Sequence, residues 1–147
     1  SEFDIYIGRT ITDIDWSITP MITRYTFQGV GGWDAWDFSL SLTYRIFTFD
    51  VSYMPQYYDF HSSDIYSRLS TAFGLGERWR VLLSLGYSKF SNETSVQFKN
   101  YLDYKLALLY SMTEFSAEFA YTDSTRQNLT GESSKDSTAA VTISKRF

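Results

Sequence analysis

The chain has no cysteine, a single histidine and only two prolines among its 147 residues. Without cysteine, disulfide bonds and thiolate metal sites are excluded. No run approaches the roughly 18 consecutive apolar residues of a membrane-spanning helix, so helical membrane crossing is excluded as well. The net charge of -4 argues against nucleic acid as a partner, because nucleic-acid binding requires a basic surface.

Aromatic residues and regular alternation are what the chain has in abundance. Aromatic side chains make up 19% of the sequence, with 12 Tyr and 12 Phe. Apolar and polar residues alternate with a period of two, which is typical of strands with one apolar and one polar face. In residues 101–111, Leu106 and Leu108 share the apolar face, Lys105 lies on the other, and Leu109 is an exception. The pattern predicts about nine strands and essentially no helix, with strands at 2–11, 15–27, 35–46, 47–54, 64–75, 79–90, 101–112, 113–123 and 136–147.

Pro20 lies inside the second predicted strand. Proline has no N–H to donate to a sheet ladder, so we expect a bulge or a local break there. Short turns follow alternate strands, and the remaining connections are longer and polar or glycine-rich, at 28–35, 55–63, 89–100 and 123–136. This alternation predicts one domain over residues 1–147, folded as an all-β, antiparallel up-and-down β-barrel.

The apolar face of such a barrel is either the inside of a soluble barrel or the lipid-facing outside of a membrane barrel. Trp36 and Tyr44 bracket aliphatic residues eight positions apart, as do Trp79 and Tyr87. Eight residues at about 3.3 Å each, tilted by about 40°, span roughly 20 Å, close to the apolar band between the aromatic girdles of membrane barrels. A small soluble barrel lacks the interior volume for so many aromatic side chains.

We therefore predict a transmembrane β-barrel in a bacterial outer membrane, with the lipid of that membrane as a partner. Every backbone polar group of such a barrel has to be paired within the closed sheet. The predicted membrane aromatic girdle consists of Trp36, Tyr44, Phe47, Tyr53, Trp79, Tyr87, Phe115 and Tyr121.

The sequence ends on Phe147, which continues an apolar face with Val141 and Ile143. A terminal aromatic residue in this position resembles the signal that the barrel-insertion machinery reads in outer-membrane proteins. The resemblance implies that machinery as a partner during biogenesis. The usual pattern has a large apolar residue where this chain has Lys145, whose side chain can extend to the membrane interface.

The order of segments is also similar to the TorF family of small outer-membrane porins. The resemblance covers the whole chain and implies about three further strands before residues 2–10, so that residues 1–147 would be the C-terminal portion of a barrel of about twelve strands. The odd count of nine predicts the same, because bacterial single-chain barrels have an even number of strands. The segments that carry the resemblance are EFDIYIGRT, WDFSLSLTYRIFTFDVSYMPQYYD, WRVLLSLGYSKF, YLDYKLALLYSMTEFSAEFAYTD and VTISKRF.

No catalytic arrangement emerges from the pattern, since cysteine is absent and His61 has no sequence neighbour that would make it a base. We predict no enzyme activity, no metal and no cofactor. Pairing Tyr110 with Phe115 would place Lys105 diagonal to Glu118, and the same logic places Asp50 diagonal to Arg45. The predicted lumen-lining residues are Asp50, Arg45, Arg68, Arg80, Asp103, Lys105, Glu118 and Arg146.

Two functions follow from a polar lumen of balanced charge. The first is a porin-like channel for the passive diffusion of small polar solutes. The second is a structural or interaction barrel with a plugged lumen, which acts through its extracellular loops. Small barrels fill their interiors with side chains, so both remain open at this stage.

Overall fold

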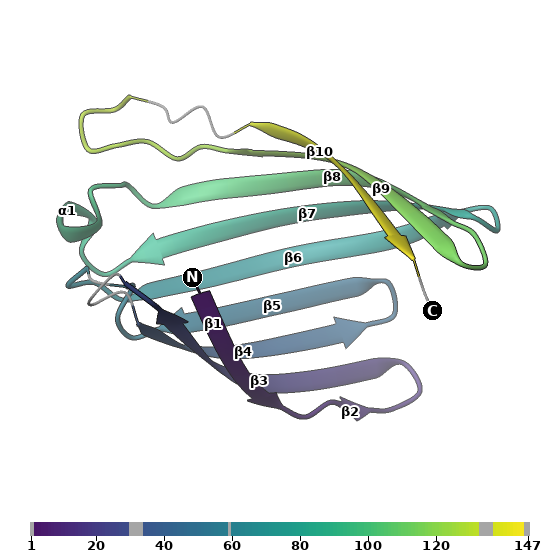
Figure 1. Cartoon of the computed structure of the whole chain (residues 1–147), viewed down its shortest axis with the longest axis horizontal. Coiled ribbons are helices and arrows are strands. Elements are labelled where there is room, and N and C mark those ends of the chain that lie inside the picture. Colours follow the sequence, from purple (N-terminus) through teal and green to yellow (C-terminus); the bar gives the residue numbers. More distant parts are fainter. Residues whose placement is uncertain (1, 30–33, 59, 133–136, 146–147) are drawn as a thin grey trace.

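A computed structural model describes residues 2–29, 34–58, 60–132 and 137–145, and within them the chain forms one antiparallel sheet. Strands that follow one another in sequence lie side by side (Figure 1). This confirms the predicted all-β, up-and-down arrangement. The strands are β1 (Glu2–Gly8), β2 (Ile11–Thr12), β3 (Trp16–Phe27), β4 (Ala35–Tyr44), β5 (Phe47–Met54), β6 (Asp64–Leu75), β7 (Trp79–Phe90), β8 (Tyr101–Ser111), β9 (Phe115–Ser124) and β10 (Thr138–Lys145).

The first predicted strand is split into β1 and β2, and Pro20 explains the split. Both pieces pair with β3 in one continuous register, in which Arg9 falls opposite Pro20. The Arg9 amide donates to the Pro20 carbonyl at 3.2 Å. The return bond requires an N–H that proline lacks, so the ladder is interrupted. The break expected at Pro20 is therefore found, but in the partner strand, while β3 itself stays intact.

The prediction of essentially no helix is confirmed for the described residues, in which the connection after β7 forms a single helical turn, α1 (Glu93–Val96). Asn92 caps it by accepting a hydrogen bond from the Ser95 amide at 3.2 Å. Within the described ranges, no helix is long and apolar enough to cross a membrane.

The sheet is strongly curled. In Figure 1 the two edge strands, β1 and β10, lie on the near side, in front of the fainter central strands. The short connections β2–β3, β4–β5, β6–β7 and β8–β9 lie at one end, and the long loops and α1 lie at the other (Figure 1). Within the described residues, β1 pairs only with β3, and β10 only with β9, so no pairing between β1 and β10 closes the sheet into a barrel.

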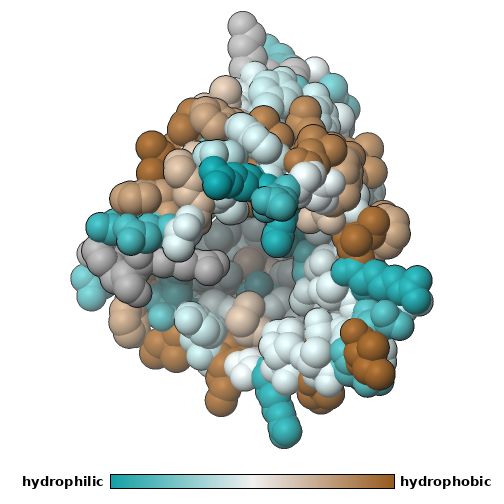
Figure 2. Space-filling model, turned by 90° about the vertical axis from the view of Figure 1, so that its right-hand side faces the viewer, coloured by the Kyte–Doolittle hydropathy of each residue, from teal (hydrophilic) through white to brown (hydrophobic). Residues whose placement is uncertain are grey.

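The two faces of the sheet have reversed exposure compared with an ordinary soluble domain. Large apolar side chains lie outside, with 54% of Leu85, 51% of Leu106 and 48% of Phe119 exposed. The polar faces of the same strands are less exposed, and Ser88 is buried. Seen from the short-turn end, hydrophobic residues lie around the outside, interspersed with hydrophilic ones, and the centre is hollowed (Figure 2). Among the described residues the buried hydrophobic set is small: Ala35, Phe90, Val96 and Ala107.

Candidate functional site

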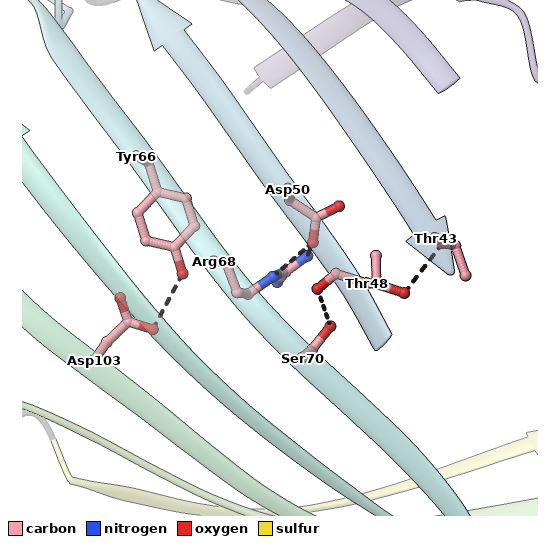
Figure 3. Close-up of polar contacts among 7 residues, drawn as sticks. All are labelled: Thr43, Thr48, Asp50, Tyr66, Arg68, Ser70 and Asp103. Carbon is pink, nitrogen blue, oxygen red and sulfur yellow. Dashed lines mark hydrogen bonds and ion pairs between the residues drawn. The ribbon is translucent and has the colours of Figure 1, made fainter. Parts of the chain in front are cut away.

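The polar face carries an ion pair between two residues on neighbouring strands that the sequence analysis had not paired with each other. Asp50 on β5 lies directly opposite Arg68 on β6. Arg68 donates to Asp50 Oδ2 from Nη2 at 2.9 Å and from Nε at 3.1 Å (Figure 3). The predicted diagonal contact between Asp50 and Arg45 was wrong, because Arg45 leaves the strand with a positive φ of 53° and its Nε lies 3.4 Å from Asp15 Oδ1.

A second polar contact spans three strands. The Tyr66 hydroxyl on β6 donates to Asp103 Oδ1 on β8 at 3.1 Å (Figure 3). The strand between them, β7, contributes Gly86 at this position, which pairs with Arg68 on one side and Asp103 on the other. A Cβ on Gly86 would lie 2.3 Å from the Tyr66 hydroxyl and 2.5 Å from Asp103 Oδ2. Contact between side chains two strands apart is possible because the sheet curls toward its polar face.

The third contact joins Lys105 to Glu118, as predicted, but in a different register. The structure places Leu109 opposite Glu118 and Ala107 opposite Ala120, so the predicted pairing of Tyr110 with Phe115 was wrong by two residues. Lys105 Nζ nevertheless lies 2.5 Å from Glu118 Oε1. The two long side chains meet because only the small Ala107 and Ala120 separate them along the strands, and Ala107 is 1% exposed.

The other predicted lumen residues are more peripheral or undescribed. Arg80 is exposed near the short-turn end of the polar face, in register with Gly74 and Leu109. Arg45 is exposed in the turn after β4, with its guanidinium 5.3 Å from the centroid of the Tyr44 ring. Arg146 and the predicted insertion signal Phe147 lie outside the described residues.

The centre of the polar face is a hollow of about 610 Å³, here called the polar hollow. Side chains from β5 to β9 and from the segment after β9 line it. Sequence reasoning missed Tyr66 and Arg126 as lining residues, although Tyr66 has the same parity on its strand as Arg68. Its charged and hydrogen-bonding lining residues include Asp64, Tyr66, Arg68, Asp103, Lys105 and Arg126.

Aromatic rings gather beneath the long loops, at the end of the sheet where α1 lies. The Tyr57 ring centroid lies 5.1 Å from that of Phe90, 4.9 Å from Tyr58 and 6.1 Å from Phe60. Val96 of α1, which follows Phe90 closely in sequence, is fully buried. Burial of the Tyr57 side chain raises the pKa of its hydroxyl to about 12, with smaller contributions from Tyr101 and Tyr58. We call Tyr57, Tyr58, Phe60 and Phe90 the loop aromatic cluster.

All eight residues of the predicted aromatic girdle are exposed on the apolar face. Two tyrosines on that face also hold a carboxylate, since Tyr104 and Tyr121 both donate to Asp123 Oδ2, at 2.8 and 3.2 Å. The ring centroids of Trp79 and Tyr110 lie 4.5 Å apart. Tyr104 and Tyr110 share the face of Leu106 and Leu108 on β8, because all four have the same parity along the strand.

His61 is exposed in the loop between β5 and β6. In the part of the chain that the structure describes, no group of three or more His, Cys, Asp or Glu side chains is arranged to hold a metal ion. Comparison with protein-family models, with curated proteins and with solved structures gave no match.

Proposed function

We propose that this chain is part of an outer-membrane β-barrel whose polar interior passes small polar solutes by diffusion. The observation that carries the proposal is the reversed exposure of the sheet: apolar side chains such as Leu85 and Phe119 are exposed, while the opposite face bears hydrogen-bonded charges. Monomeric soluble proteins rarely expose a continuous apolar surface that extends over many strands. Lipid contact removes the cost of that exposure.

The free edges of the sheet bear on the architecture of the complete barrel. In lipid an unpaired strand edge is costly, because its N–H and C=O groups have no water to bind. We propose that further strands pair with β1 and β10, giving about twelve strands in total, as the resemblance to the TorF family implies. A total of twelve also satisfies the rule that bacterial single-chain barrels have an even number of strands. Lipid and the insertion machinery are the partners of this assembly.

The charges of the interior support a weakly selective channel. Asp50 neutralises Arg68, and Glu118 neutralises Lys105, so neither sign of charge dominates these positions. Single-channel recording of the full-length protein in planar bilayers tests the proposal. We expect small conductance steps with similar permeability to small cations and anions, and the absence of any channel events would contradict it.

A second candidate function is a plugged barrel that acts through its loops, and the loop aromatic cluster favours it. These rings lie at the long-loop end of the sheet. If they close the interior, replacing Tyr57 and Phe60 together by Ala will turn a silent protein into a conducting one. If the channel is already open, the same variant will change the conductance only slightly.

A further inference from the structure

Three cationic side chains line the polar hollow, and carboxylates neutralise two of them, Arg68 and Lys105. Arg68 Nη2 lies 2.9 Å from Asp50 Oδ2, and Lys105 is paired with Glu118. Among the described residues, Arg126 forms no ion pair with a carboxylate. Its guanidinium carbon lies 3.8 Å from the centroid of the Phe98 ring and 5.8 Å from that of Tyr101. The rings fix the position of this cation but supply no formal negative charge.

The nitrogen atoms of Arg126 differ in what they can bind. Nε is buried and has no hydrogen-bond partner among the described residues, while the side chain as a whole lines the polar hollow. A ligand in the hollow would therefore meet the terminal nitrogens of the guanidinium. These donate in a planar fork that matches a carboxylate group.

Two carboxylates that line the hollow, Asp64 and Asp103, form no ion pair with any cation among the described residues. Asp103 accepts from the Tyr66 hydroxyl at Oδ1, and Asp64 accepts from the Ser88 hydroxyl at 2.7 Å. Both donors are neutral, so the negative charges remain. Asp64, Asp103 and Arg126 all line the same hollow.

We propose that the polar hollow binds a small zwitterion, with its carboxylate on Arg126 and its ammonium on the Asp103 side. A simple anion would meet the negative charges of Asp64 and Asp103, and a simple cation would leave Arg126 without a partner. A molecule with both groups satisfies both. The volume of about 610 Å³ lies within the range of small-molecule sites, roughly 300–1,000 Å³. This inference rests on the proposed function in treating the polar hollow as accessible to solutes.

Ligand-observed NMR titration of the full-length protein, folded in detergent micelles, tests the inference without measuring conductance. The probes are glycine, which carries both charged groups, acetate, which carries only the carboxylate, and methylamine, which carries only the ammonium group. We expect glycine to bind at least about tenfold more tightly than either fragment, the size of effect of one charge-assisted hydrogen bond. Arg126→Gln should weaken glycine binding about tenfold. Arg80→Gln, which changes an arginine outside the hollow, should leave glycine binding unchanged.

Asp103→Asn provides a second variant, which should weaken glycine and methylamine binding but not acetate binding. Equal affinity for acetate and glycine, or glycine binding that is unaffected by Arg126→Gln, would overturn the inference. Channel events without glycine binding would refute the zwitterion site alone. Glycine binding without channel events would refute diffusion through the barrel and leave the site standing.

Discussion

The Tyr66 hydroxyl reaches Asp103 across an intervening strand because the residue between them, Gly86, has no side chain. The hydroxyl lies 3.1 Å from Asp103 Oδ1, and a Cβ on Gly86 would come within 2.3 Å of it. Gly86→Ala should therefore break this contact or force the strands apart, at a cost of about 1–3 kcal/mol. Urea-induced unfolding in lipid vesicles measures the change.

Gly74→Ala is the matched control for that substitution. It lies on the same polar face, where the nearest atom to an added Cβ is 3.6 Å away. The Gly74→Ala protein should differ from the unsubstituted protein by less than about 1 kcal/mol in its free energy of unfolding. Equal effects of the two substitutions would show that Tyr66 and Asp103 adapt freely to a side chain between them.

The sidedness of the sheet predicts opposite effects of charge on its two faces. Leu106 is 51% exposed on the apolar face, so Leu106→Arg should destabilise the protein in lipid by about 2–4 kcal/mol, as an arginine near the bilayer midplane does. Ala72→Arg, on the exposed part of the polar face, should cost much less because water is available there. Similar costs for both variants in the same vesicles would contradict the membrane orientation.

The interruption between β1 and β2 predicts that Pro20 lowers the stability of this edge of the sheet, because proline removes one hydrogen bond of the ladder. Pro20→Thr would supply the N–H that the Arg9 carbonyl lacks, and one added hydrogen bond contributes about 0.5–1.5 kcal/mol. We expect a more stable protein, with slow hydrogen exchange at the new amide. Pro55→Thr, in the loop after β5, is the control and should show fast exchange at its new amide.

The loop aromatic cluster predicts a loss of stability in alkaline solution. Tyr57 has a folded-state pKa of about 12 against an ordinary value of 10.0. Between these values the unfolded chain loses the proton and the folded chain keeps it, so stability falls as pH rises from 10 to 12. Tyr57→Phe should show a shallower fall over that range, measured by denaturant unfolding at successive pH values. An identical slope in both proteins would refute this assignment.

The sequence by itself determined which residues form strands and which side of each strand is apolar. The alternation of side chains with period two is a local property of extended backbone, so Leu106 and Lys105 were assigned to opposite faces without knowledge of any partner strand. The effect of Pro20 was predictable for the same reason, because a missing N–H is a property of one residue.

The tertiary structure decided the register, the ion-pair partners and the state of the edges. A shift of two residues leaves every side chain on its own face, so the pattern did not distinguish pairing Phe115 with Tyr110 from the observed pairing of Ala117 with Tyr110. Arg68, rather than Arg45, pairs with Asp50 because the turn after β4 takes Arg45 out of the strand. The polar hollow, with Arg126 stacked on Phe98, depends on curling of the sheet and on loop packing, which bring together residues far apart in sequence.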